Sequence, residues 1–255
     1  MNKVLELEEV SRTFSSGVFR THTVRAVDRV SFALERGKTF GLVGNSGCGK
    51  TTLGRTILQL YTPTSGRILL DGEDITALSI TERARRGISY AFQQPVRFKG
   101  LRVGDLMNLA AGKDANIAEV CAYLSEVGLC ARDYIDRELD ASLSGGELKR
   151  IEIAMVLARG TALSVFDEPE AGIDLWSFQN LIRVFEKMYE QTRGSILIIS
   201  HQERILNIAD TIVLLKDGRL AECGPREEVL PRLLRNIDTA PPVCSMLSDP
   251  IKEVR

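Results

Sequence analysis

Short apolar runs alternate with helix-like stretches along most of this chain. This alternation of strand-like and helical segments predicts a mainly parallel sheet with helices on both faces. Segments near both ends of the chain read as antiparallel and predict a separate β-layer. The expected strands are residues 3–10, 28–34, 39–43, 67–70, 88–92, 163–166, 195–200, 212–215 and 219–222. The expected helices are residues 50–60, 147–158, 176–192 and 203–209.

The middle of the chain interrupts this alternation. From about residue 100 to 140 the apolar positions have helical spacing and no strand pattern intervenes, which indicates an inserted helical subdomain spanning roughly residues 96–160. Residues 216–218, Lys-Asp-Gly, separate two strand-like runs and predict a hairpin. The segment 236–255 contains three prolines and no clear period, and is interpreted as a C-terminal tail.

Composition excludes several classes of protein. Among 255 residues, 33 are basic and 34 acidic, a net charge of −1, so no nucleic-acid partner is expected. No apolar run approaches the roughly 18 residues that span a bilayer. The first ten residues alternate and are acidic, unlike a signal peptide, so a cytoplasmic location is expected. The five cysteines include no CxxC pair, which favours free thiols; their spacing assigns no role to Cys121, Cys130, Cys223 or Cys244.

A glycine-rich loop after the expected strand 39–43 fits the pattern G-x-x-x-x-G-K-[ST] without gaps. Its backbone N–H groups and the start of the following helix would cradle phosphates, while Lys50 would place its charge on the β- and γ-phosphates. The Thr51 hydroxyl would ligate Mg²⁺. The predicted nucleotide-binding residues are Gly44, Asn45, Ser46, Gly47, Cys48, Gly49, Lys50, Thr51 and Thr52.

Two acidic residues follow the expected strand 163–166. An acid at the carboxyl end of a parallel strand lies where open α/β sheets bind ligands. Asp167 is therefore a candidate Mg²⁺ ligand. Glu168, the next residue, would point elsewhere and orient or deprotonate an attacking water. Together with the upstream phosphate loop, this pair predicts an ATPase that takes ATP and Mg²⁺.

Leu143-Ser144-Gly145-Gly146-Glu147 forms a second glycine-rich loop that enters a second helix, again a site suited to an anion. This segment resembles the signature loop of the ATP-binding-cassette (ABC) ATPases. The resemblance implies the P-loop NTPase fold of an ABC nucleotide-binding domain, here residues 1–235. It also implies a head-to-tail dimer, in which Ser144, Gly145, Gly146 and Glu147 of one copy cap the nucleotide held by the other.

Further ABC elements occur in the order that the family shows, and the resemblance covers roughly residues 3–230. Gln93 resembles the Q-loop glutamine, which contacts Mg²⁺ and the lytic water. Residues 171–174, Ala-Gly-Ile-Asp, resemble the D-loop, which bridges the subunits. His201 resembles the switch histidine that contacts the γ-phosphate. Phe14 is the candidate for stacking on adenine, with Phe19 as the alternative. The implied catalytic residues are Glu168, His201 and Gln93, and the implied metal ligands are Thr51, Gln93 and Asp167.

Two kinds of ABC ATPase share features with this chain. Residues 24–75 resemble the ATPases of peptide or nickel importers, which act with a membrane permease. Residues 92–100, the SGGE at 144–147 and residues 200–206 resemble the ATPase of the SUF iron–sulfur cluster assembly system (SufC), which acts with a soluble scaffold. Residues 167–172 depart from the usual SUF pattern, because they contain a proline and lack a serine before the glycine. The SUF-like function is the main expectation and the importer is the alternative; the second would place the protein peripherally at the inner face of the membrane.

Overall fold

The computed structural model describes residues 2–16, 22–112, 116–192 and 194–238. Its larger sheet has six strands, and five of them run parallel with β10 in the middle. The sixth, β12, pairs antiparallel with β11 at one edge. In sheet order the strands are β12 (Arg219–Pro225), β11 (Thr211–Lys216), β3 (Thr39–Val43), β10 (Ser195–Ile199), β9 (Leu163–Asp167) and β6 (Ile88–Ala91).

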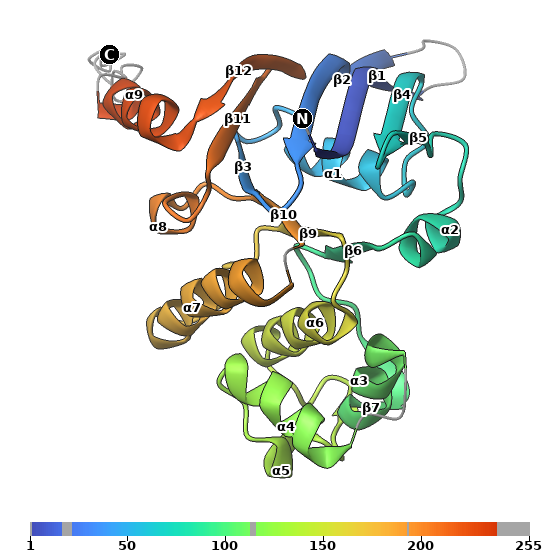
Figure 1. Ribbon diagram of the computed structural model, residues 1–255, viewed down its shortest axis with the longest axis vertical. Coiled ribbons are helices and arrows are strands. Elements are labelled where there is room, and N and C mark those ends of the chain that lie inside the picture. The colour runs from blue at the N-terminus through green and yellow to red at the C-terminus, as the bar shows by residue number, and fades with distance from the viewer. Residues whose placement is uncertain (1, 17–21, 113–115, 193, 239–255) are drawn as a thin grey trace, which may run out of the picture.

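A second, antiparallel sheet forms the β-layer (Figure 1). Its order is β2 (His22–Glu35), β1 (Lys3–Ser16), β4 (Ser65–Leu70) and β5 (Glu73–Asp74). β1 and β2 are longer than the sequence pattern predicts, because they pair as a ribbon far beyond the stretch whose apolar side chains enter the core. The predicted combination of a mainly parallel core, an antiparallel β-layer and inserted helices is confirmed.

Helix α1 (Lys50–Ile57) lies between the two sheets. Its Leu53 and Ile57 belong to one apolar cluster that also contains Leu5 of β1 and Leu42 of β3. A helix buried on both sides is held rigidly, so the loop at its N-terminus has a fixed position. On the opposite face of the parallel sheet, α6 (Gly145–Arg159) and α7 (Leu175–Thr192) pack against Phe166 and Ile198.

The inserted helices gather at the end of the molecule away from the β-layer (Figure 1). They are α3 (Val103–Ala111), α4 (Ile117–Glu126), α5 (Ala131–Tyr134) and the start of α6. A small antiparallel pair, β7 (Phe98–Arg102) and β8 (Glu138–Leu139), closes this group, although the sequence indicated helices alone there. None of the five residues of β7 is buried, so no apolar alternation was available to predict it.

Three short or terminal helices complete the described chain. They are α2 (Ile80–Arg85), α8 (Glu203–Leu206) and α9 (Arg226–Asp238). α2 and α9 were not predicted, and α8 is shorter than expected. Beyond Asp238 the expected tail, with Cys244, lies outside the described residues. Within the part of the chain described, no helix combines the length and apolar character that a bilayer crossing requires.

Candidate functional site

Four neighbouring parallel strands end at the same edge of the large sheet. β3, β10, β9 and β6 are adjacent in that order, so the residues that follow them meet at one place. These residues are the loop 44–49 after β3, His201 after β10, Glu168 after β9 and Gln93 after β6. Gly44 and His201, 157 positions apart in the sequence, thus line one pocket.

The phosphate loop depends on glycine for its shape. Gly44, Gly47 and Gly49 have φ values of 152°, 78° and 104°, a region that residues with a Cβ rarely adopt. At Gly49 a Cβ would lie 2.2 Å from the carbonyl oxygen of Ala26 in β2. The β-layer therefore packs directly against the phosphate loop, and only glycine fits at position 49.

Lys50 begins α1 and folds back over the loop. Its Nζ donates to the carbonyl oxygens of Gly44 at 2.7 Å and Asn45 at 3.0 Å. The N-cap residue, Gly49, supplies no side-chain hydrogen bond to the first turn, so the N–H groups there are not capped by it. A cation and uncapped N–H groups at a helix N-terminus together form a site for phosphate oxygens.

Asp167 lies at the end of β9, and its carboxylate is buried beside the helix start. Thr51 Oγ1 donates to Asp167 Oδ1 at 3.1 Å, and the Tyr90 hydroxyl donates to Oδ2 at 3.0 Å. Burial raises the pKa of Asp167, while the two hydrogen bonds oppose that rise. Burial also raises the pKa of Tyr90, and the negative charge of the nearby Asp167 carboxylate raises it further. Asp167 and Thr51 thus present oxygen atoms of the kind that Mg²⁺ prefers, side by side.

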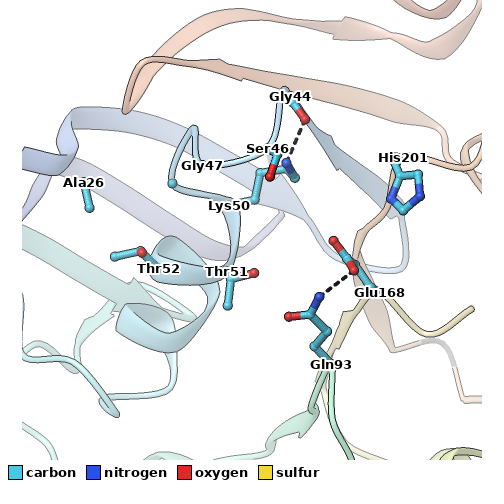
Figure 2. A pocket seen from close by; sticks show the side chains of 11 residues that line it. Ala26, Gly44, Ser46, Gly47, Lys50, Thr51, Thr52, Gln93, Glu168 and His201 are labelled. Atoms are coloured by element: carbon cyan, nitrogen blue, oxygen red, sulfur yellow. Dashed lines mark hydrogen bonds between the residues drawn. The ribbon is translucent and has the colours of Figure 1, made fainter. Parts of the chain in front are cut away.

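Glu168 turns away from Asp167 and faces the pocket. Its φ of 45° is unusual for a residue with a side chain, and its N–H donates to the Ile199 carbonyl at 2.9 Å. Gln93 Nε2 donates to Glu168 Oε2 at 2.6 Å (Figure 2). The amide holds the carboxylate at the mouth of the pocket, the arrangement required of a group that is to orient a water.

The pocket has a volume of about 460 Å³ and collects most of the predicted residues (Figure 2). Its lining is Ala26, Gly44, Ser46, Gly47, Gly49, Lys50, Thr51, Thr52, Gln93, Glu168 and His201. Sequence reasoning missed Ala26, because nothing in the sequence of a strand indicates that a loop distant along the chain will pack against one of its carbonyl groups. Tyr90, which lies outside the pocket lining, was missed because nothing in the sequence indicates that its hydroxyl reaches Asp167. The residues therefore fit Mg-ATP in size, charge and donor set.

Phe14 and Cys48 do not line this pocket. The Phe14 ring packs edge-on against Tyr61, with centroids 5.2 Å apart, and the Arg12 guanidinium lies 4.5 Å from its centre. Stacking of Phe14 on adenine remains a prediction, and Phe19 lies outside the described residues. Cys48, one of the predicted nucleotide-binding residues, is buried within the loop.

The second glycine-rich loop lies at the start of α6 and contributes nothing to the pocket of its own chain. Ser144 caps the helix: Glu147 N–H donates to Ser144 Oγ and Ser144 N–H donates to a Glu147 carboxylate oxygen, at 3.3 and 2.7 Å. Ser144 and Gly145 are exposed. The loop is therefore accessible to another molecule, as the head-to-tail arrangement requires.

Comparisons with known proteins identify the family to which this chain is similar. The profile of the ABC transporter family matches residues 27–171. An uncharacterized ABC transporter ATP-binding protein of Methanocaldococcus jannaschii is 39% identical over 209 residues, which cover 78% of this chain and 83% of the relative. The di/tripeptide transport ATP-binding protein DppF of Pseudomonas aeruginosa is 32% identical over 243 residues, covering 90% and 75%. The oligopeptide transport ATP-binding protein AppF of Bacillus subtilis is 33% identical over 245 residues, covering 89% and 73%.

Solved structures share the fold. A dimeric bacterial ABC transporter cassette superposes with a TM-score of 0.79 at 22% identity, covering 87% of this chain and 98% of that one. A bacterial Atm1-family ABC exporter with ATP bound gives 0.77 at 26% identity, covering 94% of this chain and 43% of that one.

Proposed function

The chain belongs to the ABC transporter family of ATPases, and from that membership we propose how it uses ATP: two copies close head to tail on two nucleotides and thereby move a partner protein. The protein is an ATPase, and its substrate is ATP with Mg²⁺. The proposed assignment of roles rests on one observation above all. Gln93 Nε2 donates a hydrogen bond of 2.6 Å to Glu168 Oε2, and this bond holds the carboxylate at the mouth of the phosphate-loop pocket.

In this proposal each residue has a distinct task. Lys50 leaves the loop carbonyls and binds the β- and γ-phosphates, and the glycine N–H groups bind the remaining oxygens. Thr51, Asp167 and Gln93 would hold Mg²⁺, which neutralises phosphate charge. Glu168 orients the attacking water and accepts its proton. His201 donates to the γ-phosphate as charge develops on it.

Dimerisation is proposed because the exposed Ser144–Gly145 loop has no partner in its own pocket. A Glu168→Gln variant should lose about 100-fold or more of its turnover, as expected for a lost general base. It should nonetheless bind ATP and accumulate as a dimer, because the closed state is no longer resolved by hydrolysis. Size-exclusion chromatography with light scattering, with and without Mg-ATP, measures this directly.

A second variant separates dimerisation from nucleotide binding. Adding Ser144→Arg to Glu168→Gln places a bulky cation on the signature loop but leaves the chain's own pocket intact. The double variant should bind ATP and remain a monomer. Retained turnover in Glu168→Gln, or an ATP-dependent dimer that survives Ser144→Arg, contradicts the proposed roles.

The proposed partner is a membrane permease of an importer. Two relatives named above are peptide transport proteins, and residues 24–75 resemble importer ATPases. An apolar groove of about 290 Å³ also opens beside the Q-loop. Its lining includes Leu58, Ile80, Phe92, Val96, Phe98 and Leu109. Exposed apolar side chains are suited to bind a segment of a partner protein. Because the groove lies next to Gln93, which is proposed to contact the nucleotide, a partner bound there would respond to ATP binding.

A soluble scaffold of SUF type is the second candidate. It is favoured by the resemblance of residues 92–100 and of Glu147 in the signature to that system, and none of the relatives reported above is named for it. Purification of the tagged protein from its own cells distinguishes the two, since a polytopic membrane protein supports the importer and a soluble β-rich protein supports the scaffold. Ribosomes or nucleic acid in the eluate would contradict both.

One substitution tests the groove itself. Val96 is 46% exposed in the groove, so Val96→Glu should release the partner while leaving the basal ATPase activity of the isolated protein unchanged. If the partner stays bound, the groove is not its docking site.

A further inference from the structure

Glu170 is a buried acid that the proposed mechanism does not use. It follows β9 by three residues and is only 8% exposed. Oε1 accepts a hydrogen bond from the Ser200 hydroxyl at 2.5 Å. Oε2 is buried and has no hydrogen-bond partner among the described residues. Burial raises the pKa of Glu170, because ionising its carboxyl group away from water costs free energy.

A buried carboxylate oxygen without a partner needs an explanation. Leaving such an atom unsatisfied costs free energy, and native proteins keep few such groups. A hydrophobic side chain would fill the same space at lower cost. The acid is therefore expected to gain a hydrogen-bond donor during the working cycle.

A donor beside the acid, on the side of Oε1, is the imidazole of His201. Its Nδ1 lies 3.9 Å from Glu170 Oε1, beyond hydrogen-bonding distance but within range of an ion pair. The imidazole is 62% exposed, so a rotation about its own bonds can close the gap. Hydrogen bonds between catalytic groups are often long before the substrate is bound and shorten in the complex.

The backbone around His201 already depends on Glu170. Ser200 donates to Glu170, and the Ser200 oxygen accepts the N–H of Gln202 at 3.0 Å. The two neighbours of His201 are thus joined to each other, and through Ser200 to the buried acid. The other charged groups that act on Glu170 are Glu168, which faces the pocket, and Lys149, whose Nζ contacts the carbonyl oxygens of Phe92 and Asp167.

We propose that Glu170 is a positioning residue for His201: its carboxylate accepts the Nδ1–H of the imidazole and thereby aims Nε2 at the γ-phosphate. A proton held on Nδ1 fixes both the tautomer and the orientation of the ring. When the ring carries both protons, it donates to the carboxylate at one end and to the phosphate at the other. This inference rests on the proposed role of His201 in contacting the γ-phosphate.

The tautomer can be observed directly, because the chain has only two histidines. In a His22→Gln protein labelled with ¹⁵N, the imidazole nitrogen resonances belong to His201 alone. At a pH where the ring is neutral and with no nucleotide bound, we expect the proton on Nδ1. With a non-hydrolysable Mg-ATP analogue bound, we expect Nδ1 to keep that proton while Nε2 carries a second one that it donates to the γ-phosphate. A proton on Nε2 alone in either state overturns the proposal, and this measurement requires no substitution of Glu170.

Variants supply the causal test. Glu170→Leu should abolish the Nδ1–H preference, whereas Glu203→Gln, which changes an exposed acid two residues from His201, should preserve it. Glu170→Asp keeps the charge and should keep part of the preference. An unchanged tautomer in Glu170→Leu overturns the proposal.

Kinetics distinguish positioning from simple support of the loop. Glu170→Gln should lower kcat about 10-fold with KM for ATP changed less than 2-fold, as for an interaction made in the transition state. In a His201→Ala background the same change should lower kcat no further, because Glu170 acts through the imidazole. An equal loss in both backgrounds indicates a structural role and overturns the proposal. If the wild-type protein hydrolyses ATP but His201→Ala does so equally well, the proposed role of His201 fails instead.

Discussion

Lys149 and Glu152, nearly one turn apart on α6, bind both backbone polar groups of Phe92. Lys149 Nζ donates to the Phe92 carbonyl, and Glu152 Oε1 accepts the Phe92 N–H at 2.8 Å. The two side chains also form an ion pair at 3.5 Å, with Lys149 completely buried. Phe92 directly precedes Gln93. Helix α6, which begins at the signature loop, therefore fixes the backbone next to the Q-loop glutamine.

Breaking this buried ion pair should destabilise the protein strongly. Lys149→Met leaves Glu152 buried without its counter-charge, a defect that typically costs about 3–5 kcal/mol. Adding Glu152→Leu removes the stranded charge but leaves the Phe92 N–H and carbonyl without these partners, so it should recover only part of the loss. Urea unfolding measures both. Lys187→Met is the matched control: it breaks the exposed Lys187–Glu126 pair and should cost less than about 1 kcal/mol. A loss no larger for Lys149→Met than for this control would contradict the expectation.

Removal of the Lys50 charge should abolish the ATPase activity. Lys50→Met keeps the aliphatic chain over the loop but cannot bind the β- and γ-phosphates, so ATP affinity should fall at least about 10-fold and turnover should be lost. Fluorescent-nucleotide titration and phosphate release measure the two effects. Lys187→Met, on α7 and outside the pocket, should match the wild type in both. Normal turnover in Lys50→Met would refute the assignment of the phosphate loop.

Two adjacent glycines of the signature loop should respond differently to alanine. A Cβ at Gly146 would lie 2.9 Å from the Gly172 carbonyl oxygen, whereas at Gly145 it would meet open space. Gly146→Ala should therefore push the signature loop and the D-loop apart and cost about 1–3 kcal/mol. Gly145→Ala should stay within about 0.5 kcal/mol of the wild type. Thermal unfolding compares them, and equal stabilities would show that the two loops move apart freely.

The signature-helix cap should weaken in acid. The hydroxyl of Tyr134, at 2.5 Å, and the N–H of Ser144 lower the pKa of Glu147 from 4.5 to about 2. Because the folded-state pKa is lowered, this stabilisation is complete above pH 4.5 and disappears as the pH falls toward 2. We expect the wild type to lose about 1 kcal/mol more than Glu147→Gln over that interval, given the size of capping effects. Unfolding by urea at pH 5 and pH 3 measures it.

A second variant checks the cause of that shift. Tyr134→Phe removes the largest contribution to the lowered pKa of Glu147, so its acid-induced loss should be smaller than in the wild type. Parallel pH dependence of wild type, Glu147→Gln and Tyr134→Phe would show that Glu147 does not govern the acid sensitivity.

Sequence reasoning predicted most where the chemistry is local. The phosphate loop, the acids after β9 and the signature loop are each short, continuous segments whose glycines, lysine and carboxylates imply their use. The strand before each segment is a buried apolar run, which predicts a parallel sheet. Gln93 and His201 were assigned from the resemblance to ABC ATPases, and the structure brings both beside Glu168 because parallel strands end at one edge.

Contacts between distant segments were decided by the tertiary structure alone. Tyr90 reaches Asp167 only because β6 pairs with β9, and Ala26 meets Gly49 only because the β-layer covers the phosphate loop. Likewise, the partners of Glu152 and Glu170 depend on which backbone and side-chain groups the ends of β6 and β10 bring beside them. A buried polar side chain gains or loses several kcal/mol according to its partner. Residue type and spacing within a segment therefore predict the segment's chemistry, whereas three-dimensional packing chooses the partner that tunes it.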